Sequence, residues 1–188
     1  MRKFRISSDS YYHIYNRGVN RELIFLEERN WGFFISLLRK YFKPEFIDII
    51  AYGLMPNHYH MLVYSRIDRL GELVMQPFTV SYTKAINAQQ NRVGSLFQGP
   101  YQARPVELEE QLSWMSCCIH LNPVEAGLVS RPQDWPYSSY RDFAGIRAGT
   151  LPLPNIVLSQ FKSRSEYRTY VEQSDISAPK ERSAFLPD

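Results

Sequence analysis

The chain has 188 residues, an apolar share of 44% and a formal net charge of +3, as expected of one globular domain that buries its own core and carries a terminal extension. No apolar run approaches the roughly 20 residues that a membrane-spanning helix needs, and the basic first ten residues lack the apolar stretch of a secretory signal. The only cysteines, Cys117 and Cys118, are neighbours, which argues against a disulfide framework and favours a reducing, cytoplasmic compartment.

Apolar spacing and turn residues predict an alternation of strands and helices along the chain. The predicted elements are a strand over 11–18, a helix over 27–42, strands over 46–55 and 58–64, a helix over 69–91, a strand or hairpin over 95–108 and a helix over 109–121. The turn at Pro56 and Asn57 joins the second and third strands as a hairpin. We expect a kink near Pro77 in the second helix, and we expect Asn122 and Pro123 to close the last one.

This order of elements, β-α-β-β-α-β, predicts an α+β fold of the ferredoxin-like type, an antiparallel sheet with two helices on one face. The helix over 109–121 then covers the other, open face and brings its side chains over the third strand. The apolar pattern weakens after residue 145. We therefore expect one domain over 1–145 and a C-terminal extension over 146–188 that is partly mobile.

Two histidines, His58 and His60, are separated by one residue in the third predicted strand. Strand side chains alternate between the faces of a sheet, so both imidazoles project from the same face, either as half-exposed surface residues or as ligands of one divalent metal. On the last helix, Cys118 and Asn122 are four residues apart and point together. Asn122 either ends the helix before Pro123 or supplies a third ligand. Two imidazoles with one neutral oxygen suit Mg²⁺ or Mn²⁺ on a phosphate oxygen.

Six segments match a known family in the same order along the chain. They are YHIYNRGVNRELIF (12–25), AYGLMPNHYHMLV (51–63), SYTKAIN (81–87), GSLFQGPYQARPV (94–106), IHLNPVEAGLV (119–129) and DWPYSSY (134–140). The chain thereby resembles the REP-associated tyrosine transposases of the single-tyrosine HUH superfamily. The resemblance implies a ferredoxin-like core, a His-hydrophobic-His metal site, and single-stranded DNA as substrate, with repeated palindromic elements that form hairpins.

In that family a tyrosine attacks the scissile phosphate while a divalent metal polarises it, which is nucleophilic catalysis assisted by a Lewis acid. By position, the resemblance makes His58 and His60 metal ligands and places Asn122 where a third, amide-oxygen ligand is expected. The family pattern Tyr-Ile-His-Leu-Asn-Pro reads CCIHLNP here, so Cys118 occupies the position of the nucleophilic tyrosine. A buried cysteine is more often a small inert hydrophobe than an activated thiolate.

Strand cleavage therefore depends on a substitute for the expected tyrosine. Tyr82, in SYTKAIN, is the first candidate and Tyr101 the second. Without a substitute, the chain is a catalytically inactive DNA-binding protein that keeps the fold and the metal site. An RRM-like RNA-binding module shares the order of elements, although the RNP pattern matches poorly. A hydrolytic metalloenzyme has less support, because the chain lacks HExxH and zinc-type cysteine spacing.

Aromatic residues make up 14% of the chain, and arginines are scattered among them. Aromatic rings offer stacking surfaces to bases and basic side chains follow phosphates, so single-stranded or hairpin DNA is a suitable partner. The basic residues that we expect to form one surface beside the metal site are Arg17, Arg21, Lys84, Arg92 and Arg104. The sequence leaves both a monomer and a homodimer open.

Overall fold

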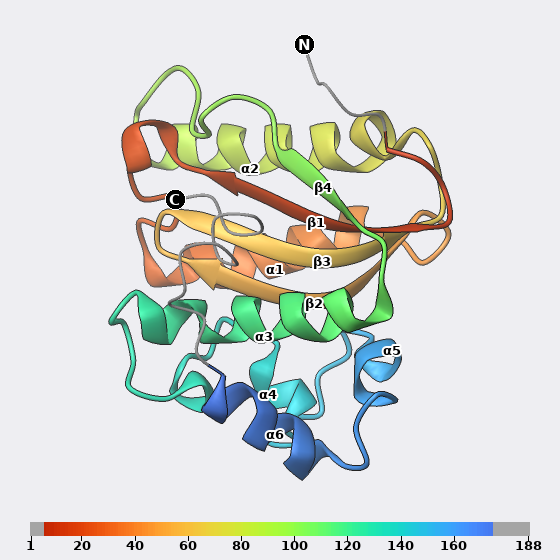
Figure 1. The fold of residues 1–188 in the computed structure, drawn as a ribbon. Coiled ribbons are helices and arrows are strands. Elements are labelled where there is room, and N and C mark those ends of the chain that lie inside the picture. Colours follow the sequence, from red (N-terminus) through yellow and green to blue (C-terminus); the bar gives the residue numbers. More distant parts are fainter. Residues whose placement is uncertain (1–5, 175–188) are drawn as a thin grey trace.

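The structure is a computed structural model in which residues 6–174 are described. Its centre is a four-stranded antiparallel sheet in the order β2-β3-β1-β4. The strands are β1 (Ser10–Arg17), β2 (Ile47–Met55), β3 (His58–Ser65) and β4 (Gln102–Val106). Helices α1 (Glu28–Tyr41) and α2 (Gln76–Gln89) cover one face, and α3 (Glu109–Glu125) covers the other (Figure 1). The predicted α+β ferredoxin-like fold, with a further helix over its open face, is confirmed.

Successive side chains of each strand point to opposite faces of the sheet, and apolar side chains on both faces form two cores. In β3, Tyr59 and Met61 are fully buried in the core that α1 and α2 complete. Leu62 belongs to the second core, between the sheet and α3. Since His58 and His60 alternate in phase with Leu62, both histidines lie on the face that α3 covers.

Helix α3 lies very close to β2 because Gly53 has no side chain. A Cβ on Gly53 would come 2.9 Å from the carbonyl oxygen of Ile119. Pro123, four residues later, has no N–H with which to donate the usual helical hydrogen bond to that carbonyl. The helix nevertheless continues to Glu125, so the prediction that Asn122 and Pro123 close it is wrong. Packing on both sides of α3 holds its last turn in helical form despite the missing hydrogen bond.

Two other elements differ in detail from the prediction. The helix predicted over 69–91 begins with a π-helical turn at Gly71–Met75, and α2 follows with Pro77 in its first turn. The backbone is helical through both elements, and Pro77 has no N–H to donate to the preceding turn, so the irregular turn lies directly before it. The segment predicted over 95–108 is a strand only in β4. Its first part is a loop that makes one bridge, between Phe97 and Gly18.

A further layer of short helices packs on the outer side of α3 (Figure 1). This layer contains α4 (Tyr140–Phe143), α5 (Asn155–Leu158) and α6 (Arg164–Gln173). Tyr167 and Val171 of α6 are fully buried in the core that α3 shares with this layer. Residues 146–174 of the predicted extension are thus packed on the domain, whereas most of the tail predicted to be mobile lies outside the described residues. None of the described helices is long and apolar enough to cross a membrane.

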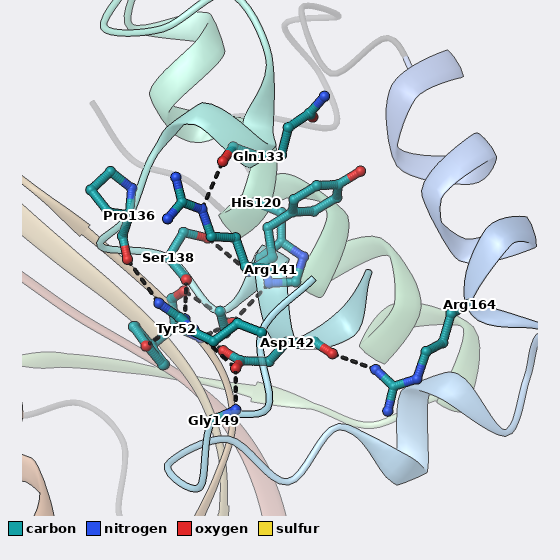
Figure 2. A network of polar contacts seen from close by, with 12 residues as sticks. Tyr52, His120, Gln133, Pro136, Ser138, Arg141, Asp142, Gly149 and Arg164 are labelled. Atoms are coloured by element: carbon teal, nitrogen blue, oxygen red, sulfur yellow. Dashed lines mark hydrogen bonds and ion pairs between the residues drawn. The ribbon is translucent and has the colours of Figure 1, made fainter. Parts of the chain in front are cut away.

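A polar network ties this layer to β2 (Figure 2). Arg147 donates to both carboxylate oxygens of Asp142, at 2.6 and 3.0 Å, and to the hydroxyl of Tyr52 at 3.1 Å. The main-chain amide of Gly149 also donates to the Asp142 carboxylate, at 2.9 Å. Arg164 of α6 donates to the main-chain oxygen of Asp142. One nearly buried carboxylate, compensated by a bidentate guanidinium, thus fixes the segment after α4 to the sheet.

Candidate metal and nucleic-acid site

The two histidines of β3 lie on the sheet face beneath α3. His58 pairs with Arg17 of β1, and His60 pairs with Tyr15 of β1 and Gly53 of β2. The ring centres of the two histidines are 4.9 Å apart, with their planes at 79° to each other. His60 is 4% exposed, whereas His58 is half-buried. Two neighbouring imidazoles therefore share one enclosed position between the sheet and α3.

The ring of His58 is held in one tautomer by the preceding turn. Its Nδ1 lies 2.7 Å from Oδ1 of Asn57. The amide nitrogen of Asn57 donates to the main-chain oxygen of Arg21 at 3.2 Å, which fixes the orientation of that amide. Because an amide oxygen can only accept, the proton of His58 sits on Nδ1 and its Nε2 keeps a lone pair. That Nε2 lies 3.2 Å from the side-chain amide nitrogen of Asn122 on α3.

Asn122 reaches the histidines from the last turns of α3, where it is 7% exposed. Its Nδ2 faces His58, and a half-turn of the amide about its terminal bond would place Oδ1 there instead. The side chain can therefore donate a hydrogen bond to His58 or offer an oxygen to a cation that His58 also binds. The structure brings His58, His60 and Asn122 together on one side of the sheet.

A third histidine, which the sequence analysis missed, stands beside them. His13 in β1 is fully buried, and its Nε2 lies 2.9 Å from Nδ1 of His60. Its register places it on the same face as Tyr15 and Arg17. The available signal was the alternation of these three residues in the first predicted strand, the same periodicity that puts His58 and His60 together.

Burial keeps both histidines of β3 neutral. It lowers the pKa of His58 to about 4, with a smaller effect from the charge of Arg17. It also lowers the pKa of His60 well below its ordinary value, with further effects from His58 and His13. Neutral imidazole is the form that binds metal ions, so both rings are in the ligating protonation state at neutral pH.

These donors fit a divalent cation with open coordination positions. Within residues 6–174, no group of three or more His, Cys, Asp or Glu side chains is placed to hold a metal. A third protein ligand beside His58 and His60 would therefore be of another kind, and the amide of Asn122 lies 3.2 Å from Nε2 of His58. Two imidazoles and one amide oxygen leave positions for water or phosphate oxygens, unlike a closed four-ligand zinc site.

Cys118 lies on α3 one helical turn before Asn122, and its side chain is fully buried. It belongs to the apolar core between α3 and the sheet, together with Leu62 and Ile119, and it forms no disulfide. A thiol in such surroundings acts as a small packing residue.

Neither candidate substitute tyrosine lies near the histidines. Tyr82 is on α2, on the opposite face of the sheet, and its hydroxyl donates to the main-chain oxygen of Ile24 at 2.7 Å. Burial raises the pKa of Tyr82 far above its ordinary value. Tyr101 is 7% exposed and belongs to the same core on the α2 side. The structure brings neither of these hydroxyl groups to the candidate metal site.

Two of the five predicted basic residues lie on the histidine face of the sheet. Arg17 pairs with His58 across β1 and β3. Arg104 pairs with His13 across β1 and β4, and its guanidinium lies 6.0 Å from the ring centre of Tyr15. A guanidinium next to the site, held against the ring of Tyr15, offers a contact to phosphate.

The other three basic residues are not on the strands of this face. Arg21 is exposed in the turn after β1, and Arg92 makes an ion pair with Glu22 at 3.8 Å. Lys84 is exposed on α2, where it lines a pocket of about 780 Å³ between that helix and the loop before β4. The structure does not bring Lys84 to the histidines.

Comparison with known proteins gives one family and a set of similar folds. The sequence profile of the family described as transposase IS200 like matches residues 6–116. A REP-associated tyrosine transposase bound to a REP hairpin has a similar fold, with a TM-score of 0.56 and 17% identity, over 81% of this chain and 93% of that one. A candidate transposase from Deinococcus radiodurans R1 aligns with a TM-score of 0.42 and 18% identity, over 61% of this chain and 92% of that one. No curated protein matches the chain.

At 17% identity, the similarity to the solved REP-associated tyrosine transposase shows only that the fold is shared. The match to the family profile is stronger evidence of membership, because it spans over half of the chain. It includes the strands that hold His13, His58 and His60. It ends two residues before Cys118. On this evidence the chain belongs to the family of IS200-like transposases.

Proposed function

We propose that the protein binds hairpin DNA with a single-stranded flank, from repeated palindromic elements, on the sheet face that carries His58 and His60. The observation that carries this proposal is the meeting of these two rings with Asn122, whose amide lies 3.2 Å from His58. Family membership supports DNA as the partner. The hairpin form is suggested by the REP-associated tyrosine transposase of similar fold, which is bound to a REP hairpin. We place this activity in the cytoplasm, where reduced thiols such as Cys117 and Cys118 are the rule.

In this proposal, His58 and His60 would hold Mg²⁺ or Mn²⁺ through the ring nitrogens that face away from Asn57 and His13, and the Asn122 amide would supply an oxygen. A cation held there supplies a Lewis acid for a phosphate oxygen of the DNA. The chain's own residues keep the imidazoles neutral by burial and orient them through hydrogen bonds at Nδ1. Arg17 and Arg104 flank the histidines and neutralise phosphates on either side.

We further propose that this binding occurs without efficient strand cleavage. Covalent cleavage needs a nucleophilic oxygen that reaches a phosphate beside the histidines. The position expected for the tyrosine holds Cys118, which is fully buried in the core. Tyr82 lies on the other face of the sheet, with its hydroxyl bonded to Ile24. A DNA-binding role is therefore better supported than strand transfer by this chain alone.

Fluorescence anisotropy with a labelled hairpin that carries a single-stranded flank tests DNA binding. We expect tighter binding to this hairpin than to a fully paired duplex of equal length. We also expect Kd to rise steeply with salt, because phosphate contacts release counterions. Equal affinity for the duplex, or binding that is indifferent to salt, would contradict the proposal. Tighter binding to RNA of the same sequence would favour an RNA-binding module instead.

Substitution of one arginine on the histidine face sharpens the test. Arg104→Gln should weaken hairpin binding and reduce the salt slope by about one unit, as expected for loss of one phosphate contact. Arg69→Gln is the matched control, since Arg69 is exposed beyond the far end of β3 and paired with Glu72 at 2.6 Å. Equal effects of the two substitutions would show that the histidine face is not the DNA-binding surface.

A further inference from the structure

His13 is placed to control how His60 uses its two ring nitrogens. His13 Nε2 lies 2.9 Å from His60 Nδ1, with the ring planes only 17° apart. His13 is fully buried and His60 is 4% exposed. The ring of Tyr15 stacks against His13 with its centre 4.9 Å away. The contact between the two histidines is therefore held by adjacent strands and shielded from solvent.

Two ring nitrogens at this distance share one proton when both rings are neutral. In one arrangement His60 Nδ1 carries that proton and donates it to His13, so that His60 Nε2 keeps a lone pair and can bind a metal. In the other arrangement His13 Nε2 carries the proton, and His60 is then protonated on Nε2 and cannot act as a ligand through that atom. Whether His13 Nε2 accepts or donates the shared proton thus decides whether His60 Nε2 can bind a cation.

His13 itself is not placed as a ligand. Within the part of the chain that the structure describes, no three His, Cys, Asp or Glu side chains converge on a metal position, so His13, His58 and His60 do not form a three-histidine site. His60 turns its Nδ1 toward His13, which leaves Nε2 for another partner. His58 has the same arrangement, with Nδ1 bonded to Asn57 and Nε2 facing Asn122.

We propose that His13 is a positioning residue of the metal site: it accepts a hydrogen bond from Nδ1–H of His60 and so fixes the tautomer in which His60 Nε2 can bind the cation. This inference deepens the proposed function and rests on it for the metal. A hydrogen bond to the second nitrogen of a metal-binding histidine fixes the ring orientation and raises its basicity, and its loss typically lowers metal affinity about 10- to 100-fold.

The test compares two amides of different reach, His13→Gln and His13→Asn. A glutamine places its terminal amide near the position of Nε2 and can accept from His60, whereas the shorter asparagine amide falls near Nδ1 and does not reach it. The chain has four histidines, so nitrogen-15 NMR of the metal-free protein resolves their tautomers, and His60→Gln identifies the His60 signals. We expect His60 to carry its proton on Nδ1 in the wild type and in His13→Gln, and to lose that preference in His13→Asn.

Manganese binding, followed by electron paramagnetic resonance, gives a second measurement. His13→Gln should bind Mn²⁺ nearly as tightly as the wild type, and His13→Asn should bind it about 10- to 100-fold more weakly. His13→Phe keeps an aromatic ring in the buried position but cannot accept a hydrogen bond, so it should behave like His13→Asn. Circular dichroism shows whether each variant is folded.

The outcomes separate this inference from the proposed function. If the wild type does not bind Mn²⁺, or if His60→Ala binds it as tightly as the wild type, the proposed metal site fails. If Mn²⁺ binding requires His60 but is unchanged in folded His13→Asn and His13→Phe, only the role of His13 is overturned. A wild-type His60 protonated on Nε2 in the metal-free protein overturns that role too, even where the variants do not fold.

Discussion

The side-chain amide of Asn122 lies 3.2 Å from Nε2 of His58, although 64 positions separate the two residues along the chain. This contact exists because α3 docks directly on β2, where Gly53 leaves room for the carbonyl of Ile119. The geometry of the candidate site thus depends on the seating of one helix against the sheet. The candidate ligands lie on β3 and α3. A shift of α3 against the sheet should therefore change the distance between Asn122 and the two histidines and weaken metal binding.

Replacing Gly53 by alanine should destabilise the fold and weaken the site together. The new Cβ would lie 2.9 Å from the Ile119 carbonyl oxygen, a main-chain atom that no side-chain rotation can move away. Helix α3 then has to shift, and overpacking of this kind typically costs about 1–3 kcal/mol. Urea denaturation measures the free energy of unfolding. A Mn²⁺ titration should show weaker binding, because Asn122 moves with the helix.

Gly32→Ala is the matched control for this substitution. Gly32 lies in α1, and a Cβ there would meet nothing within 4 Å. Alanine is the better helix former, so this variant should be more stable by about 0.5–1 kcal/mol and should bind metal normally. An unchanged unfolding midpoint in Gly53→Ala would show that α3 is not seated on β2 as described.

The Asn122 amide should contribute to metal binding through its oxygen. Asn122→Ala leaves two imidazoles alone, so Mn²⁺ affinity should fall at least about tenfold, equivalent to about 1.4 kcal/mol. Asn122→Asp should bind Mn²⁺ at least as tightly as the wild type, because a carboxylate is a stronger oxygen donor to such cations. Paramagnetic resonance titration measures both, with the exposed Asn155→Ala as control. Equal affinity of Asn122→Ala and the wild type would remove Asn122 from the ligand set.

The order of strands and helices could be predicted because it rests on local periodicity. The same-face projection of His58 and His60 follows from the period of two in a strand and needs no knowledge of neighbouring strands. His13 was missed because its partner His60 lies 47 positions away, and the strand register that joins them is not visible in the sequence. The end of α3 was misplaced because Pro123 is a local stop signal that packing on both sides of the helix overrides.

The C-terminal layer was difficult to predict for a related reason. Helix α6 has ten residues and buries only Tyr167 and Val171. Two apolar positions four apart are too short a pattern to distinguish a docked helix from a polar tail. The attachment of α6 also depends on polar contacts such as that of Arg164 with the main-chain oxygen of Asp142, two residues that the fold brings together.

Acid should destabilise the protein partly through His120, which is buried between α3 and the outer layer. Its ring nitrogens lie 2.7 Å from the Tyr167 hydroxyl and 2.8 Å from Ser139 Oγ, and burial lowers its pKa to about 3. As pH falls below about 6.5, the unfolded chain takes up a proton at this position, while the folded chain does so only near pH 3. Stability should therefore fall across this window, by up to about 1.4 kcal/mol per pH unit, in urea unfolding at pH 7, 6 and 5.

A substitution separates His120 from the other buried histidines. The pKa values of His58 and His60 are also lowered, and they act in the same direction. His120→Gln should be less stable than the wild type at pH 7, because the Tyr167 hydroxyl loses its partner at Nδ1. It should nevertheless lose less stability between pH 7 and pH 5. An equal loss in both proteins would show that the His120 ring does not contribute to the acid sensitivity.

Placing a tyrosine at position 118 should produce a trace of strand cleavage. We expect the wild type to bind hairpin DNA without forming a covalent adduct in Mg²⁺ or Mn²⁺, because Cys118 stands where the resemblance to the REP-associated tyrosine transposases leads us to expect the tyrosine. In Cys118→Tyr, the phenolic oxygen would attack a phosphate beside His58 and His60, leaving the DNA linked to the protein and releasing a 3′-hydroxyl. The yield should be low, since a ring has to enter a site where the thiol is fully buried, and overpacking typically costs about 1–3 kcal/mol. A denaturing gel of labelled hairpin DNA detects the protein-linked band.

Three further variants decide what that band means. Cys118→Phe adds the same ring without the hydroxyl, so it should give no band at similar stability. His60→Ala in the Cys118→Tyr background should abolish the band if the metal site assists the reaction. A band from the unaltered chain that disappears in Tyr82→Phe would make Tyr82 the nucleophile, in contradiction to its position on the other face of the sheet. Suppose that Cys118→Tyr binds hairpin DNA and Mn²⁺ normally but gives no band. The phenol, the cation and the DNA would then all be present without reacting. The absence of a tyrosine at position 118 would therefore not be the only feature that prevents cleavage.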